Sequence, residues 1–391
     1  MKPMAPIPVR GAAASTSARQ ENPPSIWVEI DLEAIRHNVR VLKELIGPGR
    51  LFMACVKGDG YGHGLVQAAR AALEGGADRL SVAQVEEGIN LRRAGIEAPV
   101  QVLIEPLAEQ AAALFDYGLI PSLSSPEVAQ ELAARLPGRI KVHVEVDTGM
   151  GRVTLRPAEA PAFLDLLQDL GLFEIEGLMT HFSSAHKPQD PAHRAFTLAQ
   201  LNSFEEAVRA CQAQGRRIPL KHTAASGAVV YYPETYLDMV RPGTLIYGLR
   251  FGDFDLPLKP ALSWKTRVWA VRQVAKGLGL GYEQAYAPQQ DTTIAVLAAG
   301  YADGYPRTLS NLSHVLIRGQ RAPVVGLIGM DQMMAEVDHI PGLGRGEEAV
   351  LIGQQGEAEV TASELASQLK TTPVILTVGI AGRVERVYLN Q

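Results

Sequence analysis

Polar and apolar residues follow a helical period directly after Asp31. Ile35, Val39, Leu42 and Ile46 fall on one face of a helix. Asp31 stands where an N-cap carboxylate accepts hydrogen bonds from the first free backbone N–H groups. The pattern predicts an amphipathic helix whose apolar face packs on a core.

Short apolar runs rich in β-branched residues then alternate with helical patterns. The eight runs that we expect to form strands are 51–56, 79–83, 100–104, 120–123, 140–146, 175–182, 219–223 and 239–247. Eight strands with helices between them predict an α/β fold, a (β/α)₈ barrel of the TIM type, over residues 26–256.

The pattern changes near residue 256. Later apolar runs are short and rich in Val, Thr and Ile, with few long helices between them, at 266–274, 293–298, 315–317, 323–328, 334–337 and 350–351. They predict a second, mostly β domain over residues 257–391. Residues 1–25 are rich in Ala, Pro, Ser and Arg and lack the apolar segment of a secretory signal, so we expect a disordered tail. The scarcity of acidic residues before Glu21 leaves a targeting peptide open.

Composition limits the classes of function. The chain has 37 basic and 42 acidic residues, a balance that gives no reason to expect nucleic acid or an anionic membrane as a partner. No apolar run approaches the roughly 20 residues of a membrane helix. Cys55 and Cys211 form no disulfide framework and lack the paired spacing of a metal site, so we expect no metal and a reducing, cytoplasmic location. Small-molecule chemistry is the default expectation.

Lys57 is the strongest candidate for chemistry. It follows the apolar run 51–56 and precedes the glycine-rich residues 58–64, GDGYGHG. Barrels of this kind build their sites at the C-terminal ends of strands. A lysine there presents a reactive amine, and the glycines let a bulky ligand approach the backbone. Read alone, the stretch fits a solvated lysine in a turn equally well.

Five segments in order carry a family resemblance. They are VKGDGYGHG at 56–64, VDTGMGR at 146–152, THF at 180–182, VRPGTLIYG at 240–248 and GYADGYPR at 300–307. From about Trp27 to the C-terminus the chain resembles the alanine racemases, fold-type III enzymes that use pyridoxal 5'-phosphate (PLP). The resemblance implies racemisation of L-alanine and D-alanine, with a role in supplying D-alanine for the cell wall.

The resemblance also implies two bases on opposite faces of the substrate. Lys57 is one, and Tyr282, in the segment YEQAY, matches the tyrosine that the partner subunit supplies in this family. The implied assembly is a homodimer in which the β domain of each chain completes the site of the other. Without the resemblance, Tyr282 is more simply a packing residue.

The matching motifs assign the remaining roles. Arg241 matches the arginine that meets the pyridine nitrogen of PLP, and His181 the histidine that links this arginine to the tyrosine. Arg152 and the N–H of Met330 match groups that hold the substrate carboxylate. The expected phosphate ligands are Tyr61, Ser226, Gly243 and Thr244. A surface ion pair for Arg152 and a structural role for His181 are the simpler readings.

The chain departs from the family at a few positions. Glu145 stands where many members carry a carbamylated lysine, and we expect it to supply the same negative charge to Arg152. Val374, His186 and Leu327 replace a tyrosine, an acidic residue and an arginine of the substrate channel. These smaller gates leave a broader-specificity racemase, acting on serine or larger amino acids, as an alternative.

Two other functions compete. A decarboxylase of the same fold type needs a cysteine in its C-terminal part, and none follows Cys211. A non-catalytic PLP-binding protein needs only a lone barrel, which the long second domain disfavours. A degenerate racemase that binds PLP without efficient turnover stays open.

Overall fold

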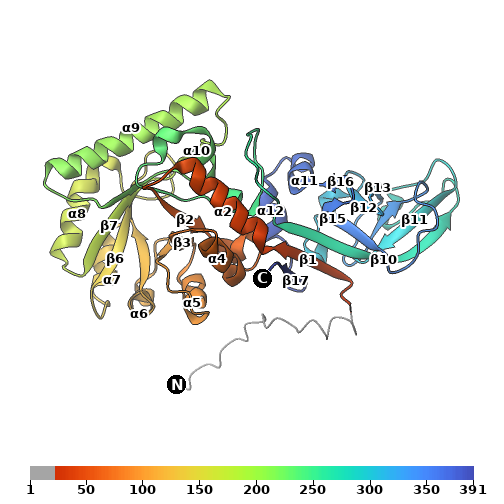
Figure 1. Cartoon of the computed structure of the whole chain (residues 1–391), viewed down its shortest axis with the longest axis horizontal. Helices are drawn as coiled ribbons and strands as arrows, with labels where there is room; N and C mark the ends of the chain where they lie inside the picture. The colour runs from red at the N-terminus through yellow and green to blue at the C-terminus, as the bar shows by residue number, and fades with distance from the viewer. Residues whose placement is uncertain (1–22) are drawn as a thin grey trace, which may run out of the picture.

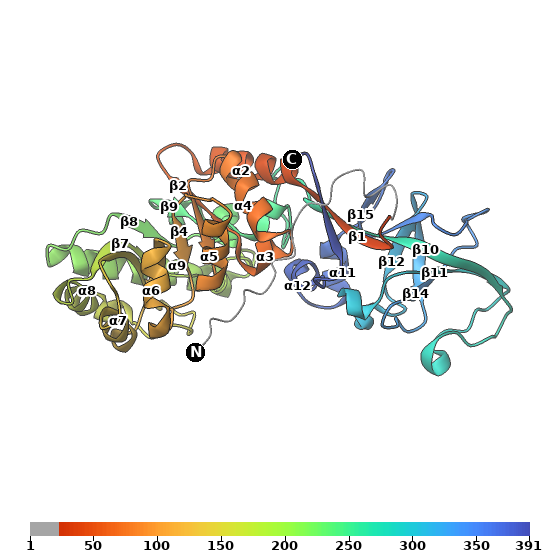
Figure 2. The ribbon, with the colours of Figure 1, turned by 90° about the horizontal axis from the view of Figure 1, so that it is seen from below.

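The computed structural model describes residues 23–391, in which a helix-covered barrel lies at one end and a β unit at the other (Figure 1). The predicted tail therefore falls almost wholly outside the described residues. Figure 2 shows the same two units from below, arranged along the long axis of the molecule. Within residues 23–391 no helix combines the length and apolarity that crossing a membrane requires.

Eight parallel strands form the barrel in the order β8-β7-β6-β5-β4-β3-β2-β9. They are β2 (Leu51–Cys55), β3 (Arg79–Val82), β4 (Val100–Val102), β5 (Leu119–Leu123), β6 (Ile140–Glu145), β7 (Phe173–Met179), β8 (Leu220–His222) and β9 (Met239–Val240). Between β8 and β9 the ring is joined by two backbone hydrogen bonds, from Asp238 to Lys221 (3.1 Å) and from Arg241 to Ala224 (2.8 Å). The predicted (β/α)₈ barrel is confirmed.

Helices surround this sheet. They are α2 (Leu32–Ile46), α4 (Leu65–Glu74), α5 (Val85–Arg93), α6 (Ala111–Asp116), α7 (Pro126–Ala133), α8 (Ala160–Asp169), α9 (Pro191–Ala213) and α10 (Ser226–Tyr231). As the pattern predicts, the Asp31 carboxylate caps α2 by accepting from the N–H groups of Glu33 and Ala34, and its four apolar positions are buried. Short 3₁₀ helices lie in the loops, at η1 (Ala108–Gln110), η2 (Pro157–Glu159) and η3 (Pro233–Thr235).

The last barrel strand is shorter than the predicted run 239–247. Strand β9 ends at Val240, and the chain continues through Arg241, Pro242 and Gly243 into the 3₁₀ helix η4 (Thr244–Tyr247). Proline has no N–H to donate to a neighbouring strand, so the ladder stops there. The backbone that leaves the strand becomes a wall of the cavity described below.

The mostly β unit contains a nine-stranded sheet in the order β16-β15-β12-β13-β14-β11-β10-β1-β17. Its strands are β1 (Ile26–Asp31), β10 (Leu262–Val274), β11 (Thr292–Leu297), β12 (His314–Ile317), β13 (Gln320–Val325), β14 (Met333–Glu336), β15 (Glu348–Gln355), β16 (Ala358–Val360) and β17 (Glu385–Leu389). Its short helices are η5 (Tyr282–Gln284), η6 (Tyr301–Asp303), η7 (Arg307–Leu309), α11 (Ala362–Gln368) and α12 (Pro373–Val378).

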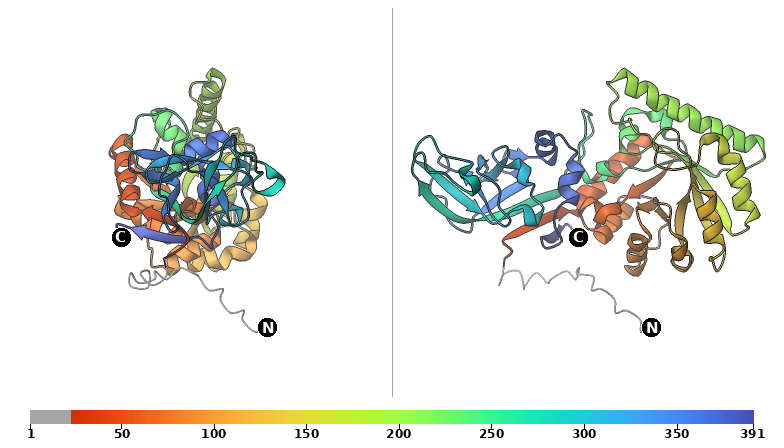
Figure 3. Two further views of the ribbon diagram at one scale, coloured as in Figure 1. Left: turned by 90° about the vertical axis from the view of Figure 1, so that its right-hand side faces the viewer. Right: turned by 180° about the vertical axis from the view of Figure 1, so that it is seen from behind.

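Strand β1 corrects one detail of the sequence prediction. Residues 26–31 were assigned to the barrel, yet β1 pairs antiparallel with β10 and parallel with β17 in the sheet of the other unit. The described part of the chain thus passes from β1 in the β unit into the barrel through α2 (Figure 3, right). The alternating side chains of IWVEID suit a strand that buries one face, so Val28 and Ile30 are fully buried. The other predicted domain limits stay predictions.

Candidate active site

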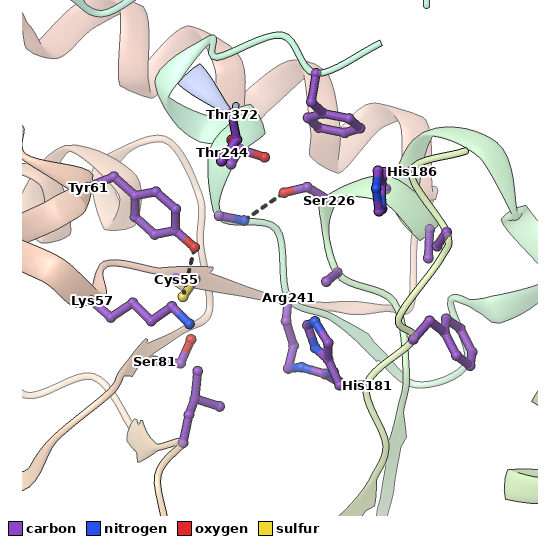
Figure 4. A pocket seen from close by; sticks show the side chains of 18 of the residues that line it. Cys55, Lys57, Tyr61, Ser81, His181, His186, Ser226, Arg241, Thr244 and Thr372 are labelled. Carbon is purple, nitrogen blue, oxygen red and sulfur yellow. Dashed lines mark hydrogen bonds between the residues drawn. The ribbon is translucent and has the colours of Figure 1, made fainter. Parts of the chain in front are cut away.

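A cavity of about 1410 Å³ opens at the C-terminal ends of the barrel strands. Eight of the ten predicted site residues line it, and they are Lys57, Tyr61, Arg152, His181, Ser226, Arg241, Gly243 and Thr244. Figure 4 shows Lys57 and Tyr61 on one side and Arg241 with His181 on the other. The fold therefore gathers side chains that lie almost 190 residues apart in the sequence.

A left-handed turn presents Lys57. Directly after β2, the short segment α3 (Lys57–Tyr61) has positive φ at Gly58 (64°), Asp59 (54°) and Gly60 (61°). Glycine adopts this conformation without the steric cost that a Cβ brings. The Gly58 N–H donates to Glu87 Oε1 (2.7 Å), and Asp59 Oδ1 accepts from Leu65 N–H (2.8 Å). These bonds fix the turn, and Lys57 points into the cavity (Figure 4).

The predicted phosphate ligands form one wall. The Ser226 hydroxyl accepts from the Gly243 N–H (2.9 Å). A Cβ on Gly243 would lie 2.3 Å from the Tyr61 hydroxyl oxygen, so only glycine fits. The buried Thr244 hydroxyl has no hydrogen-bond partner within residues 23–391. Burial raises the pKa of Tyr61 well above its usual value, so its hydroxyl stays neutral and able to donate. Hydroxyl and backbone donors beside an unpartnered polar atom fit a phosphate group.

Arg241 is buried at the edge of the cavity. Its Nη1 donates to His222 Nδ1 (2.7 Å), and its Nη2 donates to the carbonyl oxygens of Thr180 (2.8 Å) and Thr223 (3.3 Å). Burial lowers the pKa of Arg241 to about 10, which still leaves it charged at neutral pH. This guanidinium is a fixed cationic donor facing the cavity.

His181 is held neutral beside this cation. Burial, and then the positive charges of Arg241, Arg152 and Lys57, lower the pKa of His181 to about 3. The histidine that hydrogen-bonds to Arg241 is His222, which the sequence reasoning did not single out. The predicted link from His181 to a tyrosine stays a prediction.

Ser81, at the end of β3, was also missed. Its side chain lines the cavity near Lys57, and its buried hydroxyl lacks a partner among the described residues (Figure 4). Its backbone carbonyl accepts from the Val56 N–H (2.9 Å), which places it next to the Lys57 strand. A hydroxyl between the apolar residues Leu80 and Val82 is the only signal that the sequence carries for it.

Glu145 pairs with Arg152 as predicted. Arg152 Nη2 lies 3.1 Å from Glu145 Oε1, and the glutamate side chain is 4% exposed against 43% for the arginine. The anion is thus fixed on the barrel wall, and the arginine reaches from it towards the open cavity. Whether Glu145 does the work of a carbamylated lysine stays a prediction.

Tyr282 and Met330, in contrast, lie outside the cavity, exposed by 62% and 53%. Tyr282 is in the connection between β10 and β11 of the β unit (Figure 1). The two positions are neighbours, since a Cβ on Gly329 would lie 3.8 Å from Tyr282 Cε2. They form a second, exposed group of site candidates on the β unit.

The three substrate-channel positions at which the chain departs from the family also differ in whether they line the cavity. His186 lines the cavity, whereas Leu327 and Val374 do not, although the residues Thr372 and Pro373 next to Val374 do. The C-terminal helix α12 thus borders the cavity from the β unit of the same chain.

A parallel barrel that surrounds a lysine, a buried arginine and unpartnered hydroxyls at the C-terminal ends of its strands is built as an enzyme for a small molecule. Comparisons with known proteins give the family. Sequence models described as "Alanine racemase, N-terminal domain" and "Alanine racemase, C-terminal domain" match residues 30–251 and 261–388. The chain belongs to the alanine racemase family, whose members are isomerases.

Individual relatives agree along almost the whole chain. The alanine racemase of Symbiobacterium thermophilum is 45% identical over 93% of this chain and 96% of its own, and that of Halothermothrix orenii is 42% identical over 93% and 97%. The crystal structure of alanine racemase from Bacillus anthracis with bound L-Ala-P superposes with a TM-score of 0.88 at 34% identity, covering 94% of this chain and 95% of that one.

Proposed function

We propose that this enzyme interconverts L-alanine and D-alanine with PLP as cofactor. The observation that carries the proposal is the pairing, across one cavity, of Lys57 with a wall where Gly243 has no room for a side chain and the Thr244 hydroxyl lacks a partner. When bound, PLP withdraws electrons from the α-carbon of an amino acid and so makes its proton removable.

The residues of the wall would hold the phosphate of PLP. Tyr61 and Thr244 supply hydroxyl donors, and the 243–244 backbone and Ser226 supply close polar contacts. Arg241 would face the pyridine nitrogen. Because an arginine has no acceptor atom and stays charged, it favours an unprotonated ring nitrogen. That state limits electron withdrawal and directs the chemistry to proton removal and return.

The substrate carboxylate would meet Arg152. A guanidinium suits a carboxylate because two N–H groups can donate in parallel. The ion pair with the buried Glu145 limits the positions that Arg152 adopts. The partner subunit's Met330 would add a backbone N–H.

Racemisation needs a base on each face of the α-carbon. Lys57 serves one face. Tyr282 of the same chain is exposed on the β unit and does not line the cavity that holds Lys57. The partner subunit's Tyr282 is therefore the second base that we propose, and a homodimer with shared sites follows.

The cellular role that we propose rests on the family resemblance. We infer a cytoplasmic enzyme that supplies D-alanine for the cell wall. A broader-specificity racemase is the second candidate, favoured by the small Val374 beside the cavity wall and by His186 on it. A non-catalytic PLP-binding protein is the remaining one.

Proton exchange at the α-carbon distinguishes these functions. The PLP-loaded protein is incubated in D₂O with L-alanine, L-serine and larger L-amino acids, and NMR follows loss of the α-proton while a chiral assay follows the product. We expect exchange with racemic product, fastest for alanine. Faster turnover of serine or a larger amino acid would establish the broad-specificity enzyme, and PLP binding without any exchange would overturn the proposal.

A further inference from the structure

Buried side chains connect Arg241 to the opposite end of the barrel. Arg241 Nη1 lies 2.7 Å from His222 Nδ1, and His222 Nε2 lies 2.6 Å from His143 Nδ1. His143 Nε2 lies 3.0 Å from Glu176 Oε2. We call this row the histidine chain, and its members are Arg241, His222, His143 and Glu176.

The hydrogen bonds of the histidine chain can point in only one direction. Arginine donates and cannot accept, so His222 Nδ1 is the acceptor and its proton is on Nε2. That proton is donated to His143 Nδ1, and the His143 Nε2–H is donated to Glu176. Burial, followed for His222 by the charge of Arg241, lowers the pKa of each imidazole, which agrees with two neutral rings.

The histidine chain ends at the ionised carboxylate of Glu176. Glu176 accepts a hydrogen bond from Arg79, and Lys141 Nζ lies 3.0 Å from its other oxygen. Although burial raises the pKa of Glu176, the bond from His143 and the charges of Arg79 and Lys141 lower it to about 2. An ionised carboxylate strengthens the imidazole in front of it as an acceptor. Arg241 therefore donates to a strong acceptor.

Gly177 gives independent support, because it follows Glu176 on β7 and pairs with His143 on β6. A Cβ at Gly177 would lie 2.6 Å from His143 Nδ1, in the middle of the histidine chain. Its φ is not positive, so the backbone conformation does not require glycine. Glycine is required at this position because the His143 ring occupies the space that a side chain would need.

We propose that His143 and Glu176 are positioning residues that hold the guanidinium of Arg241 in place through His222. The inference rests on the proposed function, in which Arg241 faces the ring nitrogen of PLP. With Nη1 and Nη2 engaged by the barrel, the remaining N–H groups of Arg241 keep one direction towards the cavity. The far end of the barrel thus contributes to the electrostatics of the site.

Glu176→Gln tests this directly. The glutamine amide oxygen takes the place of Glu176 Oε2, because that atom also accepts from Arg79, so the hydrogen bonds keep their direction but lose the negative charge that strengthens His143 and His222 as acceptors. Gly177→Ala displaces the His143 ring and removes no polar group. It is the second test variant, to be used if Glu176→Gln fails to fold because Arg79 loses its carboxylate partner. Lys141→Gln is the control, because it removes an ion pair of Glu176 and leaves the histidine chain intact.

The readout is the ¹⁵N NMR shift of PLP labelled at its ring nitrogen, in loaded protein without substrate at pH 7.5. In wild type and Lys141→Gln we expect the shift of an unprotonated ring. In Glu176→Gln and Gly177→Ala it moves towards the protonated position, and kcat falls roughly tenfold with little change in KM. If Glu176→Gln and Gly177→Ala both show the wild-type ¹⁵N shift and the wild-type kcat, the inference is refuted. Wild-type protein that fails to bind PLP or to racemise would instead refute the proposed function.

Discussion

Single polar atoms carry much of the argument for the site. The Thr244 hydroxyl is buried without a partner among residues 23–391, although buried polar groups are nearly always satisfied. The hydroxyl of Thr154, which lines the same cavity, donates to the Ser124 carbonyl (2.9 Å). The contrast supports our proposal that the phosphate of PLP satisfies the Thr244 hydroxyl.

Thr244→Val is expected to weaken PLP binding about five- to tenfold, because one hydrogen bond to the phosphate of about 1 kcal/mol is lost. The free energy of unfolding of the cofactor-free protein should stay within about 0.5 kcal/mol of wild type, since no existing bond is broken. Thr154→Val is the matched control. It removes the hydrogen bond to the Ser124 carbonyl, so we expect a lower free energy of unfolding and an unchanged affinity for PLP. Fluorescence titration with PLP and urea unfolding measure both, and unaltered PLP affinity in Thr244→Val would exclude Thr244 from the phosphate site.

Glu145→Gln tests the anion beside Arg152. Loss of the ion pair should raise KM for alanine severalfold, about 1 kcal/mol, because the arginine is partly exposed and loses its fixed position. Glu159→Gln, which removes an exposed ion pair with Arg156, should leave KM unchanged. Steady-state kinetics decide, and an unchanged KM in Glu145→Gln would show that Glu145 does not orient Arg152.

Local motifs explain which site residues were predictable. Lys57 lies at the end of an apolar run with glycines close by, and Arg241 lies in the segment VRPGTLIYG that carries the family resemblance, so neither position needed tertiary information. His222 and Ser81 were not found because their roles come from neighbours on other strands, which sequence spacing does not reveal. His222, for example, meets Arg241 only because β8 and β9 close the barrel.

At the scale of elements, the turn after β2 contacts helix α12. A Cβ on Gly62 would lie 2.1 Å from the Thr377 carbonyl oxygen, and φ at Gly62 is +86°. The lysine turn and the helix that borders the cavity are thus in direct contact, and each limits the position of the other.

Gly62→Ala should therefore cost more than about 2 kcal/mol of unfolding free energy, from the positive φ and the clash together. Gly49→Ala is the control, since its φ is +81° but nothing lies within 4 Å of the added Cβ. It should lose only the backbone contribution, about 1 kcal/mol. Urea unfolding compares the two variants, and equal losses would show that α12 does not press on the turn.

The same turn predicts a pH dependence of stability. The His63 Nδ1–H donates to the carbonyl oxygens of Gly60 and Tyr61 (3.0 Å each), and burial lowers the pKa of His63 from 6.5 to about 4. Because its folded pKa lies below the unfolded one, the unfolded state binds more protons between these values. The contribution of His63 is complete above pH 6.5 and is lost as the pH falls towards 4.

The free energy of unfolding should fall in this window, with His63 contributing up to about 1.4 kcal/mol per pH unit. In His63→Asn the unfolding free energy should change less steeply with pH, by an amount that corresponds to the uptake of up to one proton. This difference in slope does not depend on the absolute stability of the variant. Urea unfolding at several pH values between 4 and 7 measures the slope. An identical slope in both proteins would show that folding does not lower the pKa of His63.

Strand prediction succeeded where runs were continuous and buried, as in β2 and β6, and failed at element ends. The run 239–247 combined a strand and a 3₁₀ helix, because Pro242 ends the ladder although the residues after it remain apolar. Strand β1 is not among the predicted strands, and its residues fall in the predicted barrel domain, since its partners β10 and β17 lie more than 200 residues away. Short-range patterns contain no information about such pairings.

For the whole molecule, the central point is that the candidate site residues fall into two groups that do not share one cavity. The barrel holds Lys57, Arg241 and the proposed phosphate ligands, whereas the exposed Tyr282 and Met330 lie on the β unit, outside that cavity. A single chain therefore presents two incomplete sets of residues. Two chains arranged reciprocally complete both sites, which is the assembly that we propose.

Mixing two inactive variants tests this assembly most directly. Lys57→Ala and Tyr282→Phe are purified, shown to be inactive alone, mixed, dissociated and reassociated, and assayed for racemisation of L-alanine. With shared sites, each mixed dimer contains one site with both native residues. Random pairing makes half of the dimers mixed, so we predict recovery of roughly a quarter of wild-type activity. No recovery, in mixtures shown to contain mixed dimers, would contradict a site built from Lys57 of one chain and Tyr282 of the other.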